Sequence, residues 1–204
     1  MKRLALAAVG VACVLLGVVV GAWWQHQPDP PRAATVSLEP LEVGFAQDMS
    51  SHHLQAIELC HALASPREPM IDALCTQITS AQNQEIGVLS GWLMLLDQPQ
   101  TSPQPMAWMG TGHHHSGAHM PGMASWTEMD ELRRLTGPPA ETAFLQLMIR
   151  HHRGGLGMAS HAAQHATTRA VAQLATSMIK EQSEEIGVME PLLAARGGEQ
   201  LPYP

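Results

Sequence analysis

The sequence predicts an all-α protein: an antiparallel four-helix bundle made of two duplicated helical hairpins, preceded by an N-terminal membrane-spanning helix. Two observations predict the bundle. Residues 45–53 (FAQDMSSHH) align with residues 144–152 (FLQLMIRHH), and residues 84–89 align with residues 184–189, so the chain contains an internal duplication. Apolar residues recur at helical spacing in each half, without a competing alternating pattern typical of strands. A length of 204 residues suffices for one compact core plus an appendage.

The N-terminal segment, residues 1–24, has the features of a transmembrane anchor. Two basic residues precede an uncharged run over residues 4–22, about the length that a helix needs to cross a bilayer. Trp23 and Trp24 then suit the boundary between lipid and water. Because basic residues favour the cytoplasmic side, we expect the rest of the chain on the periplasmic or extracellular side. A cleaved signal peptide is the alternative, which would leave a secreted protein.

A proline-rich tether over residues 25–42 joins this anchor to the bundle, which is expected over residues 43–196. Short turns within each hairpin make its two helices antiparallel, and a long crossover over residues 97–136 connects the hairpins. Near the end of the crossover, Ser125 and Glu128 form a capping box that starts a short helix.

Capping signals predict where the longer helices begin and end. In the first hairpin, Ser65 and Pro66 supply an N-cap and a proline at the first helical position, so the second helix is expected to begin there. In the second hairpin, a helix is expected over residues 138–165. The helix that follows is capped by Thr168 and ends at Gly197.

The composition favours a soft cation as the partner. A net charge of −7, with only one Tyr and two Phe, argues against nucleic acid. Twelve His and 13 Met are more imidazoles and thioethers than an ordinary core requires. Imidazole suits copper and zinc, whereas thioether selects Cu(I) and similar ions. The mixture therefore favours copper as the cofactor, Cu(I) in particular, with silver or zinc as alternatives.

Each repeat places one Met beside two His on the same helix, because residues three and four apart share a face. The third helix continues this pattern for three more turns, and the crossover holds a second group of donors among glycines and prolines, which we interpret as a capture arm. The predicted metal ligands are Met49, His52, His53, Met148, His151, His152, Met158, His161 and His165, and in the crossover Met106, Met109, His113, His114, His115, His119, Met120 and Met123.

Four further side chains have predicted roles around these ligands. In an antiparallel register Glu85 and Glu185 fall within about one turn of a His pair, where they would orient an imidazole or join the coordination. Cys60 and Cys75 lie at nearly equal distances on either side of the first hairpin's turn, so an oxidising compartment favours a disulfide between them. Two free thiols or two soft-metal ligands are the alternatives.

The repeated Phe-x-x-x-Met-x-x-His-His segments, together with the Gln/Glu-Glu-Ile lines, resemble a ferritin-like family of unknown function that includes the periplasmic copper-binding protein CopM. The likeness covers about residues 43–191. It implies a ferritin-like four-helix bundle outside the cytoplasm, with copper or silver held by Met and His in some members and no established activity in most. The positions that it carries over as ligands are Met49, His52, His53, Met148, His151, His152 and Met158. Leu59 stands in the first repeat where Met158 stands in the second, which implies a weaker or structural first site.

The expected function is sequestration or buffering of copper outside the cytoplasm, without enzyme activity. The expected partners are the metal ion, the membrane through the N-terminal helix, and a protein that receives copper. A structural or interaction bundle whose paired histidines make interhelical hydrogen bonds is the main alternative. A di-iron carboxylate oxidoreductase needs Glu-x-x-His from two helices. Glu58 and His61 supply one such motif, but Gly157 and Ser160 occupy the matching positions of the second half.

Overall fold

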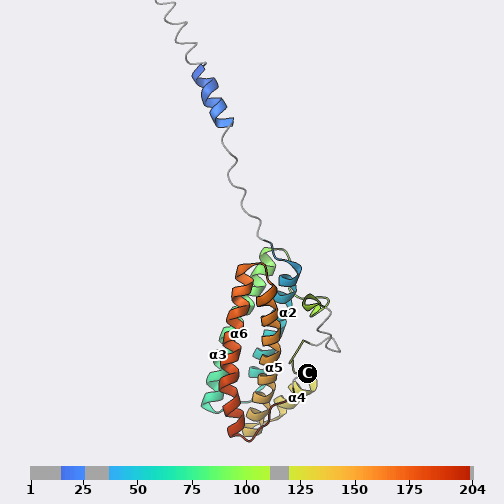
Figure 1. Ribbon diagram of the computed structural model, residues 1–204. Coiled ribbons are helices and arrows are strands. Elements are labelled where there is room, and N and C mark those ends of the chain that lie inside the picture. The colour runs from blue at the N-terminus through green and yellow to red at the C-terminus, as the bar shows by residue number, and fades with distance from the viewer. Residues whose placement is uncertain (1–14, 26–36, 111–119, 203–204) are drawn as a thin grey trace, which may run out of the picture. The chain divides into compact units, whose positions relative to one another are not determined.

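All regular structure is helical in the part of the chain that the computed structural model describes, residues 15–25, 37–110 and 120–202. The elements of the bundle are α2 (Pro40–Ala62), α3 (Pro69–Leu95), the 3-10 turn η1 (Ala107–Met109), α4 (Trp126–Arg134), α5 (Gly137–His165) and α6 (Arg169–Ala195) (Figure 1). The prediction of an all-α helical bundle is confirmed.

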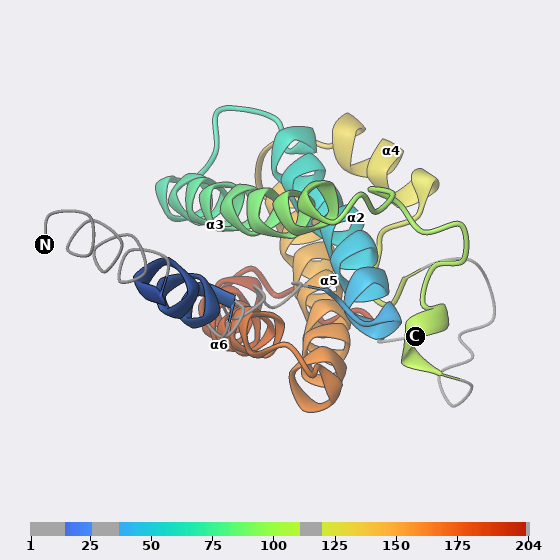
Figure 2. The same ribbon diagram turned by 90° about the horizontal axis from the view of Figure 1, so that it is seen from above.

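The two hairpins meet through their first helices. Within the hairpins α2 packs on α3 and α5 packs on α6, and the main contact between hairpins is that of α2 with α5. Figure 2 shows α2 and α5 side by side, with the short helix α4 beside them. Residues on α2 and α5 therefore occupy the centre of the bundle, and the repeated His-His pairs lie on these two helices.

The predicted start of the second helix is wrong by three residues. The helix α3 begins at Pro69 rather than Pro66, and its N-cap is Glu68, whose side chain accepts a hydrogen bond from the Ile71 amide at 3.3 Å. The segment contains two capping signals in succession, Ser65 with Pro66 and Glu68 with Pro69. Both offer a proline for the first turn, and the sequence alone did not distinguish them.

The other predicted helix ends agree with the structure. Ser125 and Glu128 form the capping box of α4, with the Ser125 amide donating to Glu128 Oε2 at 2.7 Å. Thr168 is the N-cap residue of α6, although its hydroxyl donates to Glu42 Oε2 at 2.9 Å instead of capping the helix. After α6, Gly197 adopts a left-handed conformation with φ of 68°, as expected for a helix terminator.

The chain divides into two units, Met1–Val36 and Ser37–Pro204. In the first unit residues 15–25 form a helix on which Trp23 and Trp24 are exposed. Within the described ranges no helix combines the length and the apolar character needed to cross a membrane. Residues 1–14 of the predicted anchor and most of the tether lie outside those ranges, and the anchor stays a prediction.

Buried apolar side chains form two clusters, one at each end of the bundle. The cluster around the start of α2, here called the methionine-rich end, contains the buried methionines Met49, Met109, Met158 and Met178. The cluster around the start of α3, here called the cysteine end, contains Cys60 and Cys75. Between the two clusters the bundle buries polar side chains, and these make up the candidate site.

Candidate metal centre

The centre of the bundle is a buried polar layer that we call the histidine layer. Its members are His52, His53, His151, His152, Gln82, Glu85, Gln182 and Glu185. Adjacent residues on a helix point about 100° apart. Each His-His pair therefore directs one imidazole toward the other hairpin and one toward the second helix of its own hairpin.

Two imidazoles of the layer meet carboxylates within their own hairpins. His152 Nε2 lies 2.6 Å from Glu185 Oε2, and His53 Nε2 lies 2.7 Å from Glu85 Oε2. The His152 contact has hydrogen-bond geometry, whereas the His53 contact is close but poorly aligned for a hydrogen bond. The antiparallel register thus places both glutamates beside the histidines, where the sequence predicted them. The structure does not test whether they assist a metal.

The other two imidazoles meet at the interface between the hairpins. The rings of His52 and His151 lie 3.8 Å apart between centroids, with their planes inclined at 34°. His151 Nε2 donates to the carbonyl of His52 at 3.0 Å, and His52 Nε2 donates to the carbonyl of Pro121 at 3.1 Å. Because a carbonyl can only accept, both rings carry their proton on Nε2 and present a lone pair on Nδ1.

The Nδ1 atoms of all four buried imidazoles have no hydrogen-bond partner among the described residues. The side-chain amides of Gln82 and Gln182 also leave atoms without partners there. Buried polar atoms in folded proteins are nearly always paired, so such a concentration calls for an explanation. The sequence analysis did not single out the two glutamines. They stand three residues before Glu85 and Glu185 at matching repeat positions, a signal that was available.

Burial keeps the imidazoles of His52, His53 and His151 neutral. It lowers the pKa of His52 and His53 to about 3, and it holds the pKa of His151 well below its usual value. Burial and the neighbouring charge of Glu185 raise the pKa of Glu85 to about 7. Neutral imidazole is the form that coordinates metal ions. These three side chains therefore supply nitrogen donors that require no deprotonation at neutral pH.

A segment of the crossover, residues 120–125, lies directly against this layer, and we call it the strap. Gly154 of α5 allows the approach, because a Cβ there would lie only 1.9 Å from the carbonyl oxygen of Pro121. Gly122 of the strap has φ of 77°, and a Cβ on it would lie 2.3 Å from the Arg150 carbonyl oxygen. Backbone thus packs on backbone beside His52.

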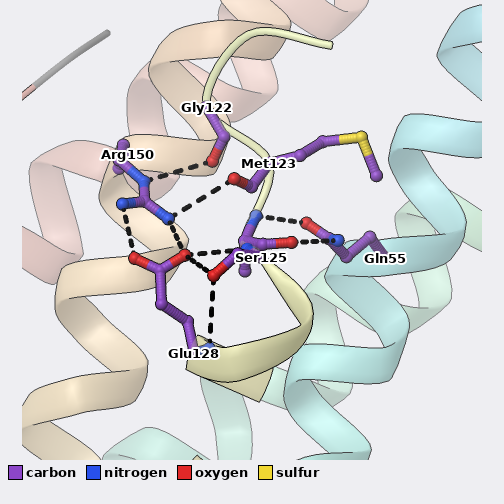
Figure 3. A network of polar contacts seen from close by, with 7 residues as sticks. Gln55, Gly122, Met123, Ser125, Glu128 and Arg150 are labelled. Atoms are coloured by element: carbon purple, nitrogen blue, oxygen red, sulfur yellow. Dashed lines mark hydrogen bonds and ion pairs between the residues drawn. The ribbon is translucent and has the colours of Figure 1, made fainter. Parts of the chain in front are cut away.

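Polar contacts fix both sides of the strap (Figure 3). Arg150 of α5 makes two contacts with Glu128, at 2.7 and 2.8 Å, and this pairing lowers the pKa of Glu128 to about 2. Gln55 of α2 donates to the Ala124 carbonyl at 2.9 Å and accepts from the Ala124 amide at 2.7 Å. Met123, a predicted ligand, lies on the strap with its carbonyl facing Arg150.

The methionine-rich end gathers most of the predicted thioethers. Met49 and Met158 are fully buried there together with Met109. Met106 and Met120 of the crossover are partly buried against the same cluster. The sequence analysis did not single out Met178, which lies in this cluster too.

Trp108 and Asp48 join the crossover to this end. The Asp48 carboxylate accepts from the Trp108 indole at 2.8 Å and from the Met106 amide at 2.6 Å. The ring centroid of His161 lies 5.5 Å from that of Trp108 and 4.2 Å from that of His165, which stacks on it. Predicted ligands from α5 and the crossover therefore come together near one end of the bundle.

Other predicted ligands are not part of this group. Met148 belongs to the cysteine end, where Leu59 lies in the same cluster. The crossover residues His113, His114, His115 and His119 lie outside the described residues. In the described part of the chain, no three or more His, Cys, Asp or Glu side chains are arranged to hold one metal ion.

The structure does not contain the predicted disulfide: Cys60 and Cys75 are both free, buried thiols. The hairpin does bring the two thiols into hydrogen-bonding contact. The equal spacing of the two cysteines from the hairpin's turn predicts that they lie close together. A covalent bond also requires oxidation, which spacing does not determine.

The fold and site define a class of duplicated helical-hairpin bundles with histidines and carboxylates buried across the middle. The chain belongs to the DUF305 family, described as a domain of unknown function, whose sequence pattern matches residues 42–193. This match confirms the family that the repeated Met-x-x-His-His segments indicated. Among curated proteins none matches the chain.

Solved structures include several similar bundles. A DUF305 protein from Streptomyces coelicolor, described as secreted, is 38% identical over 79% of this chain and 96% of its own, with a TM-score of 0.72. A DUF305 fragment from Deinococcus radiodurans is 32% identical over 78% of this chain and 99% of its own, with a TM-score of 0.67. CopM in its Cu(II)-bound form is 23% identical over 76% of this chain and 96% of its own, with a TM-score of 0.61, and shares the fold.

Proposed function

We propose that this protein binds metal outside the cytoplasm and sequesters or buffers copper, without catalysing a reaction. The observation that carries the proposal is the set of four buried imidazoles whose Nδ1 atoms lack partners among the described residues. A cation that accepts a nitrogen lone pair would satisfy these atoms, and the buried Glu85 and Glu185 would balance its charge. The chemistry of these donors therefore suits metal ions, although no three or more of the described His, Cys, Asp or Glu side chains are arranged around one point.

Copper is favoured over other ions by the sulfur donors next to the layer. Thioethers select soft ions such as Cu(I) and Ag(I), and the methionine-rich end supplies Met49, Met158 and Met109 from three different elements. CopM, which shares the fold, has been solved in Cu(II)-bound, Cu(I)-bound and silver-bound forms. We propose that Met106, Met120, His161 and His165 extend the same site toward the surface, and that a separate protein receives the metal.

The proposed location outside the cytoplasm rests on two supports. The N-terminal run of apolar residues is typical of export, either as a retained anchor or as a cleaved signal. The Streptomyces coelicolor relative is described as secreted.

A purely structural bundle is the second candidate, and the interhelical contact of His152 with Glu185 favours it. In that case the histidine layer would serve only to fix how the helices pair. The two functions differ in their response to metal, because only a metal site gains stability when an ion binds the folded state.

Anaerobic titration of the purified chain with Cu(I), followed by native mass spectrometry, tests the proposal. The wild-type chain should retain copper, and the double variant His151→Ala, His152→Ala should lose the ions held by the layer because two of its four imidazoles are gone. The double variant His161→Ala, His165→Ala removes two histidines of the same helix from the proposed extension and leaves the layer intact, so it should keep the ions held by the layer. Equal copper stoichiometry in the wild type and the first variant, with both folded by circular dichroism, would exclude the layer as a metal site.

A further inference from the structure

A second group of soft donors lies at the cysteine end of the bundle, away from the histidine layer. A surface cavity of about 340 Å³ opens there beside the first hairpin's turn. Its lining consists of Cys60, His61, Arg67, Cys75, Thr76, Thr79 and Ser80. Both thiols thus border a cavity that an ion can enter, although their side chains are almost fully buried.

The thiols of Cys60 and Cys75 contact each other and Arg67. A hydrogen bond joins the thiols of Cys60 and Cys75, and this contact together with burial raises the pKa of the Cys60 thiol. The same hydrogen bond lowers the pKa of Cys75, and so does Arg67, whose positive charge and hydrogen bond favour the thiolate. The two thiols and the guanidinium therefore lie together, and a metal ion that binds both sulfurs replaces their two protons.

Arg67 also supplies the charge that such a site needs. Two thiolates bound to one monovalent cation carry a net charge of −1, which a buried site tolerates only with a compensating cation. The Arg67 guanidinium already contacts Cys75, and its Nε is buried with no partner among the described residues. The Oδ1 atom of Asp72, a largely exposed side chain, lies 3.6 Å from Nη1 of Arg67 and forms an ion pair with it.

We propose that Cys60 and Cys75 form a two-thiolate site for one soft monovalent cation, Cu(I) or Ag(I), with Arg67 as its counter-charge. Binding forms two metal–sulfur bonds and releases one proton from each thiol, and the metal and both sulfurs keep their oxidation states. The site is independent of the histidine layer and does not rest on the function proposed for that layer. Only the first repeat has it, because Ala159 and Ala175 occupy the matching positions of the second repeat.

The second repeat suggests the test variant. The full chain is reduced, freed of reductant and titrated anaerobically with Cu(I) and, separately, with Ag(I). The double variant Cys60→Ala, Cys75→Ala copies the residues of the second repeat, and we expect it to bind one cation fewer than the wild type by native mass spectrometry. The variant His151→Ala, His152→Ala should keep this cation, so that failure at one site is distinguished from failure at the other.

A second measurement needs no variant. Iodoacetamide alkylates free thiols, and one equivalent of Ag(I) beyond saturation of the other sites should slow alkylation of Cys60 and Cys75 at least tenfold, read by peptide mass spectrometry. The variant Arg67→Gln should weaken this protection. Unchanged stoichiometry in the folded double Ala variant would overturn the proposal. If that variant fails to fold, unchanged alkylation of the wild-type chain in the presence of Ag(I) would overturn it.

Discussion

The two ends of the bundle derive from the same duplicated sequence, yet they offer different sulfur chemistry. At the methionine-rich end Met49 lies with Met158, whereas at the cysteine end their repeat counterparts are Met148 and Leu59. The cysteine end instead holds two thiols. A repeated fold thus preserves the imidazoles in the middle while each end changes its donors independently.

The largest expected effect tests whether the two ends are equally important for stability. Phe45 and Phe144 occupy matching repeat positions, are fully buried, and lie in opposite clusters. Each Phe→Ala substitution should lower the free energy of unfolding by about 3–5 kcal/mol through lost burial and an unfilled cavity. Urea denaturation of the two variants measures the costs side by side. A loss below about 1 kcal/mol in one variant alone would show that this end does not contribute to the cooperative core.

The histidine layer between the ends should make stability depend on pH. The pKa of His52 and His53 is about 3 in the folded chain and near 6.5 once exposed, so the unfolded chain binds more protons between these values. Stability should therefore fall as the pH drops below about 6.5. His151 acts in the same direction. Glu85, with its pKa raised to about 7, acts in the opposite direction below pH 7, but it is one group against three.

Denaturation midpoints at pH 7 and pH 5 check this dependence. The variant His52→Ala should show a shallower loss between the two values, because one depressed imidazole has been removed. The structure shows these imidazoles shielded from water. A wild-type chain that is equally stable at both pH values would contradict this burial.

A smaller effect concerns the strap, which covers the layer on one side. Gly154→Ala places a methyl group 1.9 Å from the Pro121 carbonyl oxygen, so the strap or α5 must shift, at a cost of about 1–3 kcal/mol. Gly87→Ala is the matched control, because a Cβ at this position meets nothing within 4 Å. The substitution also removes a flexible glycine from a helix. It should stabilise the chain by about 0.5–1 kcal/mol. Thermal unfolding distinguishes the two, and similar shifts in both would contradict the close backbone contact.

The smallest expected effect on stability compares the matched methionines. Met49→Leu and Met148→Leu conserve volume, so each should cost less than about 1.5 kcal/mol. Only Met49→Leu should weaken binding of Ag(I), because Met49 lies in the same cluster as Met109 and Met158 of the proposed site, whereas Met148 lies in the other cluster. Competition titration with a silver chelator measures the difference. Equal weakening by both substitutions would reject the distinction between the ends.

Much of the fold could be predicted because its signals are local and repeated. The duplication, the helical spacing and the capping box at Ser125 each depend on residues close in sequence. The placement of Glu85 and Glu185 beside histidines followed from antiparallel register alone.

The remaining features depend on how distant segments pack. The start of α3 was misplaced because Pro66 and Pro69 offer competing first turns. The assignment of Met49 and Met148 to opposite ends requires knowing that α2 and α5 contact each other at their histidines. The state of the cysteine pair depends on oxidation, which spacing does not encode.

The strap also covers one route from the surface to the histidine layer. An ion that approaches His52 from that side must first detach the backbone of residues 120–125, which Arg150 and Glu128 hold by two charged contacts. Because the pKa of Glu128 is about 2, mild acid leaves this clasp intact. Under the proposed function, loading and release along that route require this backbone to open first, and a slow opening would make slow release compatible with modest affinity.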